Sequence, residues 1–95
     1  MNQVAGDISK SLFGNRYILA CAAAVAGYSN GRFTQKNVAS TAGIERNVAA
    51  LALQRFEAAE LIKRLPLDGR EQPYQRVESV YWTLCAKLLK EVEGR

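Results

Sequence analysis

Gly43, in the middle of a helical pattern, is the feature that most restricts how this chain can fold. Apolar residues recur at helical spacing on both sides of it, in the segment VASTAGIERNVAALALQRF, residues 38–56. Glycine adopts the left-handed conformation that ends a helix with little strain. Ile44 follows as an apolar anchor, and the helical pattern then resumes. Two helices joined by about three residues must cross at a steep angle.

The first helix of this pair is predicted to begin at Thr34. A threonine hydroxyl at the N-cap accepts a hydrogen bond from a backbone N–H two or three residues later, here that of Lys36 or Asn37. The second helix runs to about residue 59. The predicted helix pair therefore covers residues 34–59.

Three further elements surround this pair. An apolar stripe at steps of three and four predicts a helix over residues 7–27, with Asp7 or Ser9 as its cap. The turn-rich segment GYSNGRF ends that helix, and Phe33 brings the chain back to the core. A last apolar stripe predicts a helix over residues 79–93.

Between residues 61 and 78 the pattern becomes extended. Asp68-Gly69 stands between two short runs of strand-forming residues, which is a strong signal for a β-hairpin. Pro66 and Pro73 bracket the loop, and each lacks the backbone donor that a ladder needs, so both strands must be short.

The bulk properties narrow the class of protein. A chain of 95 residues with 48% hydrophobic content can bury one core, so a single domain over residues 1–95 is expected. The longest apolar run, residues 17–27, is too short to span a bilayer, and no leader precedes it, so a cytoplasmic location is expected. Cys21 and Cys85 lie in apolar helical patterns, which favours buried thiols in a reducing compartment.

Several kinds of chemistry have no residues to support them. The chain has no histidine and no cysteine pair at ligand spacing, so neither a metal nor a cofactor is expected. It also has no nucleophile motif and no glycine-rich phosphate loop after a strand, so an enzyme is not expected.

The charge points to an anionic partner. The formal net charge is +4, with a pI near 9.3, and residues 32–76 contribute 8 basic and 5 acidic side chains, or +3 of that total. A basic balance favours association with a polyanion without determining the fold. We therefore expect an anion to meet the middle of the chain.

Residues 34–65, TQKNVASTAGIERNVAALALQRFEAAELIKRL, resemble the core of the ArsR-like and MarR-like winged-helix transcription regulators. The likeness lies in Ala39, Gly43, Ile44, Leu53, Phe56 and Leu61-Ile62, and it extends over about residues 12–85. The resemblance implies a mainly α fold with a small β-hairpin wing, a winged helix-turn-helix in the order helix-helix-helix-strand-strand-helix. Glu60 stands where the family usually has glycine, so the turn into the wing is expected to be longer or less sharp.

The second helix of the pair would then enter the major groove of double-stranded DNA. Arg46 could contact guanine, Asn47 or Gln54 adenine, and Ala50 a thymine methyl group. Other roles stay open, because alanines also form helices and pack against neighbours, and Arg46 can be an ordinary solvated residue. For Ala49 and Ala52 the packing role is favoured.

Phosphate contacts are expected from two further places. Thr34, Gln35 and Lys36 form the first turn of a helix, where backbone N–H groups favour an anion. The resemblance places Arg70, at the hairpin tip, on the DNA backbone or in the minor groove. Arg64 and Arg76 flank it on the predicted strands.

Both outer helices show apolar stripes larger than a small three-helix core can absorb. The resemblance implies a homodimer through these helices, residues 7–27 and 79–93, with two recognition helices about 34 Å apart. The interface residues expected on this basis are Tyr17, Cys21, Val25, Trp82, Cys85, Leu88 and Leu89.

The leading hypothesis is a homodimeric regulator of transcription that binds double-stranded DNA sequence-specifically. The alternative is a winged-helix protein-interaction module that does not read bases, which the modest charge and the sparse recognition helix motivate. Redox sensing by Cys21 and Cys85 across a dimer interface is a third, weaker hypothesis.

Overall fold

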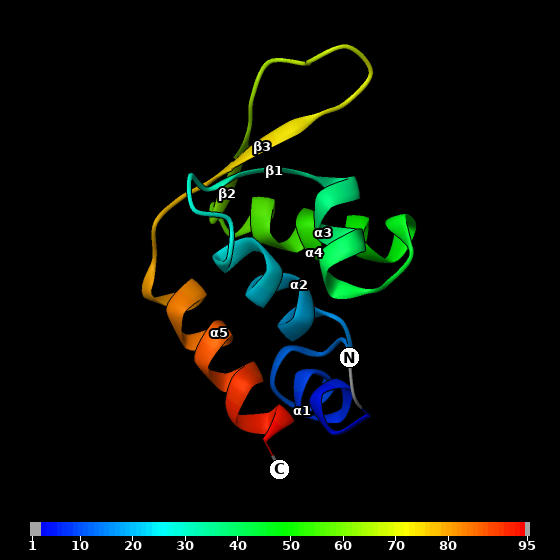
Figure 1. Ribbon diagram of the computed structural model, residues 1–95, viewed down its shortest axis with the longest axis vertical. Coiled ribbons are helices and arrows are strands. Elements are labelled where there is room, and N and C mark those ends of the chain that lie inside the picture. The colour runs from blue at the N-terminus through cyan, green and yellow to red at the C-terminus, as the bar shows by residue number, and fades with distance from the viewer. Residues whose placement is uncertain (1–2, 95) are drawn as a thin grey trace.

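Residues 3–94 of a computed structural model form a mainly helical fold with one small antiparallel sheet (Figure 1). The elements in chain order are α1 (Gln3–Phe13), α2 (Ile18–Ala26), β1 (Arg32–Thr34), α3 (Gln35–Ala42), α4 (Arg46–Ala58), β2 (Ile62–Arg64), β3 (Pro73–Arg76) and α5 (Val80–Glu93). The class is the expected one, a mainly α fold with a small β-hairpin.

The helix predicted over residues 7–27 is two helices, α1 and α2. Gly14 adopts a left-handed conformation with φ 78°, and the Asn15 side chain accepts a hydrogen bond from the Tyr17 N–H at 2.8 Å. Buried Ser9 donates to the Asn15 carbonyl at 2.6 Å and accepts from the Leu19 N–H at 3.0 Å. Ser9 therefore caps α2 from within α1, instead of starting a helix of its own.

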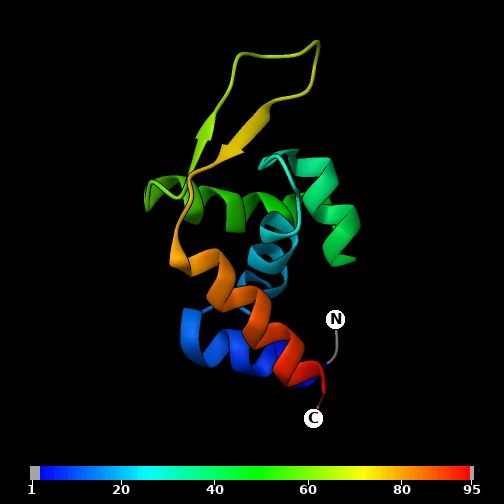
Figure 2. The same ribbon diagram turned by 60° about the vertical axis from the view of Figure 1, so that its left-hand side comes forward.

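Helix α2 lies at the centre of the molecule, with α5 packed alongside it (Figures 1 and 2). Seven of its nine residues are buried: Ile18, Leu19, Ala20, Cys21, Ala22, Ala24 and Val25. A helix that is apolar on all sides is buried on all sides. Its alanines leave room for the neighbouring helices to approach.

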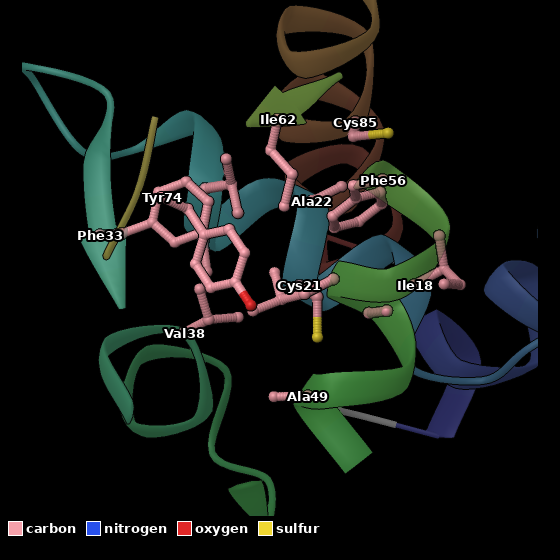
Figure 3. Packing of buried hydrophobic residues seen from close by; sticks show 14 of the residues in the cluster. Ile18, Cys21, Ala22, Phe33, Val38, Ala49, Phe56, Ile62, Tyr74 and Cys85 are labelled. Atoms are coloured by element: carbon pink, nitrogen blue, oxygen red, sulfur yellow. The ribbon is translucent and has the colours of Figure 1, made fainter. Parts of the chain in front are cut away.

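The sheet has three strands in the order β1-β3-β2, one more strand than the sequence predicted. Phe33 of β1 pairs with Tyr74 of β3, and their stacked rings lie 5.7 Å apart between centroids (Figure 3). Phe33 is 2% exposed, which confirms that it returns the chain to the core. A three-residue strand shows too little alternation to be recognised in a sequence.

The predicted hairpin is present, and it joins β2 to β3. Asp68 and Glu71 exchange backbone hydrogen bonds of 3.1 Å around Gly69, whose φ is 63°. The loop over residues 65–72, here called the wing loop, extends beyond the body of the molecule on the side of α3 (Figures 1 and 2).

Two helices end in the same left-handed motif. Gly43 has φ 70°, and the Ile44 N–H donates to the Ala39 carbonyl at 3.0 Å, as expected for a glycine stop. Glu60 has φ 61°, and the Leu61 N–H donates to a carbonyl five residues earlier at 2.8 Å. The turn into β2 is therefore as sharp as a glycine turn, contrary to the expectation for Glu60.

Cys21 and Cys85 are free thiols buried in the core, which confirms the prediction from their apolar surroundings. Burial raises the pKa of Cys21 to about 12 and also raises the pKa of Cys85. The two sulfur atoms lie well apart, one on α2 and one on α5 (Figure 3).

Candidate nucleic-acid interface

The residues predicted to contact DNA lie on three elements: the start of α3, the exposed side of α4, and the wing loop with its strands. Thr34 is the N-cap of α3, as predicted. Its hydroxyl accepts from the Asn37 N–H at 3.2 Å, while the Asn37 side chain accepts from the Thr34 N–H at 2.9 Å. This reciprocal cap fixes the first turn of α3, from which Lys36 extends into solvent.

Gln35 ties the start of α3 to the start of α4. Its side-chain amide donates to the Arg46 carbonyl at 2.8 Å. The Thr34 hydroxyl and the Gln35 amide are thus already engaged within the chain. Of these three predicted contacts, only Lys36 has an exposed side chain for which the structure describes no hydrogen bond.

Helix α4 presents two distinct sides. Its buried side consists of Ala49, Ala52, Leu53 and Phe56, which confirms the packing role of the two alanines. Arg46, Asn47 and Gln54 are exposed on the other side, with half-buried Ala50 between them. The predicted base-contacting residues therefore share one accessible stripe. Leu51, which is 52% exposed, adds an apolar side chain to it.

Arg46 is close to the wing loop. Its Nη2 atom lies 3.8 Å from Oε2 of Glu71, and the two side chains are 58% and 44% exposed. An exposed ion pair at this distance contributes little stability, about 0–1 kcal/mol. The contact nevertheless places a carboxylate beside the first residue of the exposed stripe.

Arg64 lies on β2 with its guanidinium engaged by Glu57 of α4. Nε and Nη2 of Arg64 donate to the two carboxylate oxygens at 2.8 Å and 3.3 Å. The hydrogen bond to Glu57 raises the pKa of Arg64, and the carboxylate balances its charge. A phosphate would have to compete with Glu57 for this side chain.

Arg76 is placed differently from the prediction, because it faces the interior. Its Nη1 donates to three carbonyls at the end of α2, those of Val25, Ala26 and Tyr28, at 2.9–3.2 Å. Nε donates to Glu78 at 2.8 Å, and the side chain is only 11% exposed. Arg76 therefore completes the C-terminus of α2 and is not available to DNA.

Arg70 stands at the tip of the wing loop and is exposed, as predicted. Within residues 3–94 it forms none of the ion pairs that the structure describes. Asp68 and Glu71 flank it.

Arg32 was not singled out from the sequence, yet it belongs to this surface. It is exposed on β1 and lines a hollow of about 320 Å³ together with Thr34, Asn37, Asp68 and Glu71. No sequence signal could have identified it, because its exposure depends on the three-residue strand β1, which is too short to be recognised from alternation.

The predicted dimer residues divide into two groups. Cys21, Val25, Trp82 and Cys85 are at most 3% exposed, because α2 and α5 pack against each other within one chain. The chain's own core thus absorbs the apolar stripes that suggested an interface. Tyr17, Leu88 and Leu89 are half-buried against the same core. The more accessible apolar side chains on α1 and α5 are those of Leu12, Val80 and Leu84, which are 54–83% exposed.

Among residues 3–94 no cluster of cysteine, aspartate and glutamate side chains is arranged to hold a metal ion. Within the same range no helix is both long and apolar enough to cross a membrane.

Comparison with protein-family models and with curated proteins finds none that matches this chain. The exposed stripe of α4, the capped start of α3 and the wing loop are therefore the features from which a function is argued.

Proposed function

We propose that this protein is a winged helix-turn-helix domain that binds double-stranded DNA sequence-specifically and regulates transcription as a homodimer. The exposed polar stripe of α4, set beside the start of α3 and the wing loop, is the observation that carries the proposal. The steep helix pair α3–α4, followed by the β2–β3 hairpin and a sheet in the order β1-β3-β2, supports the winged-helix assignment.

The electrostatics of this surface suit a phosphate backbone. Arg32, Lys36, Lys63 and Arg70 are exposed, and none of them takes part in the ion pairs described for residues 3–94. Lys36 and Arg70 would position the duplex from two different elements, α3 and the wing loop, since phosphate contacts fix orientation. Arg76 has no part in this revised contact set, and Arg64 contributes only when it is released from Glu57.

Base reading is assigned to Arg46, Asn47, Ala50 and Gln54. The first two occupy the N-terminal turn of α4, the part of a recognition helix that meets base edges. Ala50 is small and half-buried, so it lets the helix backbone lie deep in the groove beside a thymine methyl group.

A second copy of the chain would place two such stripes on successive major grooves. Since four of the predicted interface residues are buried within one chain, the dimer face is reassigned to Leu12, Val80 and Leu84. Sedimentation of wild type at tens of micromolar tests this, with Leu84→Glu expected to be monomeric. A wild-type monomer at that concentration would refute it.

The DNA-binding proposal is tested by the affinity for a labelled random-sequence duplex at increasing salt. The logarithm of the affinity should fall with log salt by about 0.9 for each phosphate contacted. Arg70→Ala should weaken binding and reduce the slope by about 0.9, the value for one phosphate contact. Lys87→Ala, an equal charge change on α5, should do neither. A flat salt response would contradict the proposal.

The alternative, a protein-interaction module without base reading, draws support from exposed leucines on the same surface. Leu51 and Leu67 are 52% and 68% exposed, on α4 and in the wing loop. A folded protein that binds no duplex even at low salt would favour this alternative. Both proposals retain the expected cytoplasmic location.

A further inference from the structure

The wing loop holds two carboxylates against the surface proposed to receive DNA. Asp68 and Glu71 line the hollow of about 320 Å³ opposite Arg32 and the capped start of α3, where Thr34 and Asn37 lie. The loop leans over the same side of the molecule as α3 in both views (Figures 1 and 2).

The two carboxylates are positioned by the backbone of the turn. Asp68 and Glu71 exchange N–H to carbonyl hydrogen bonds of 3.1 Å, and Gly69 takes the positive φ that closes the turn. Both side chains therefore come from one hydrogen-bonded four-residue turn. Glu71 is additionally 3.8 Å from Arg46, at the start of the exposed α4 stripe.

Positive groups lie in and beside the hollow, where DNA is proposed to approach. Arg32 is exposed, the α3 N-terminus carries partial positive charge, and Arg46 begins α4. Two carboxylates lie where a polyanion would approach. Charges separated by less than the Debye length, about 8 Å at physiological salt, are not fully screened from one another.

We propose that the Asp68–Glu71 turn is an autoinhibitory contact that competes with DNA for Arg32, the start of α3 and Arg46. The inference rests on the proposed DNA-binding function. In the free protein the turn neutralises this surface. On binding, the contact to Arg46 breaks easily, because an exposed ion pair at this separation is weak. The turn thereby lowers the affinity for duplex DNA.

The test compares Glu71→Gln and Asp68→Asn, which keep the size of each side chain, with Glu93→Gln, which makes the same charge change at an exposed position of α5. Glu71→Gln should bind a random-sequence duplex about three- to tenfold more tightly at 50 mM salt, with the gain shrinking as salt rises. Asp68→Asn should shift affinity in the same direction, and Glu93→Gln by less than about twofold.

An Arg46→Ala background separates competition from a general charge effect. There the gain from Glu71→Gln should be smaller, because the residue that Glu71 faces is gone. Circular dichroism and thermal melting establish that each variant is folded. Both substituted side chains lie on the surface turn, so folding should be unaffected.

The outcomes are distinguishable. Tighter binding by Glu71→Gln, even where the wild type binds too weakly to measure, supports autoinhibition. Equal or weaker binding by Glu71→Gln beside a wild type that binds overturns the inference and leaves the proposed function standing. Loss of base preference without a gain in affinity also overturns it, since Glu71 would then position Arg46. If neither the wild type nor the Asp68→Asn/Glu71→Gln double variant binds duplex DNA, both proposals are overturned.

Discussion

At the scale of single residues, identical side chains have different roles that only their contacts reveal. Arg76 caps α2, Arg64 pairs with Glu57, Arg55 donates to the Phe13 carbonyl at 2.9 Å, and Arg70 extends into solvent. Each was a surface cation as far as the sequence could tell. Their partners are set by tertiary packing, since Arg76 and the carbonyls that it meets are about fifty residues apart in the chain.

Arg76→Ala should lower the free energy of unfolding by about 2 kcal/mol, because a charged donor to several carbonyls is removed from a largely buried position. Urea unfolding followed by circular dichroism measures it. Arg70→Ala is the control and should change stability by less than about 0.5 kcal/mol. An equal effect of the two substitutions would mean that Arg76 does not act as a cap.

Ser9→Ala should lower the free energy of unfolding by about 1–3 kcal/mol, since the buried Leu19 N–H loses its acceptor and the Asn15 carbonyl its donor. Ser11→Ala, an exposed position in the same helix, provides the matched comparison and should be close to neutral. Equal stability of the two variants would argue against Ser9 as the cap of α2.

At the scale of elements, local signals were reliable where one residue type decides the conformation. Thr34, Gly43 and the Asp68-Gly69 turn were all identified, because capping and left-handed turns depend on side chains only a few residues away. The break between α1 and α2 and the strand β1 were not. The apolar spacing continues across Gly14, and β1 is held by its distant partner β3.

Glu60 lies in the left-handed turn after α4, where winged-helix regulators usually carry glycine, and its φ of 61° is strained for a residue with a Cβ atom. Glu60→Gly should therefore raise the free energy of unfolding by about 0.5–1 kcal/mol, the relieved strain outweighing the greater freedom of glycine in the unfolded chain. Thermal melting detects it.

Glu60→Ala is the control for this substitution, because alanine removes the charge and keeps the Cβ atom, so it should give no comparable gain. Lower stability of Glu60→Gly than of Glu60→Ala would show that the left-handed turn carries no strain.

At the scale of the whole molecule, the apolar stripes of the outer helices could be predicted from the sequence. The elements that cover these stripes could not. The sequence suggested a second chain, whereas α2 is enclosed by α1, α3, α4 and α5 of its own chain. Periodicity identifies a face that must be buried without identifying its partner. Among the residues predicted to contact DNA, those on α4 and Arg70 are accessible, whereas Arg76 is largely buried. Arg32 is exposed on β1 and was not singled out from the sequence.

The buried thiols make stability depend on pH above neutrality. Burial raises the pKa of Cys21 to about 12, so the folded state keeps a proton that the unfolded state releases near its ordinary pKa of 9.0. The contribution is complete below pH 9 and is lost as pH rises towards 12. Burial also raises the pKa values of Cys85 and Tyr81, which act in the same direction.

Urea unfolding at pH 7, 9 and 10.5 should therefore give a falling free energy of unfolding above pH 9. Cys21→Ala should reduce this fall, because the substitution removes the contribution of the Cys21 thiol and leaves the other titratable groups in place. The slope of the free energy of unfolding against pH should become less steep by up to about 1.4 kcal/mol per pH unit. Identical slopes for the two proteins would mean that the Cys21 thiol ionises as freely in the fold as outside it.

The exposed stripe of α4 is proposed to read DNA bases, and the decisive experiment is selection of bound fragments from random duplex DNA. Wild type should enrich a short palindrome, and Arg46→Ala should relax the preference at one base in each half-site while Arg70→Ala weakens all sequences equally. No enrichment by a folded protein at low salt would contradict the claim and direct attention to protein partners of the same surface.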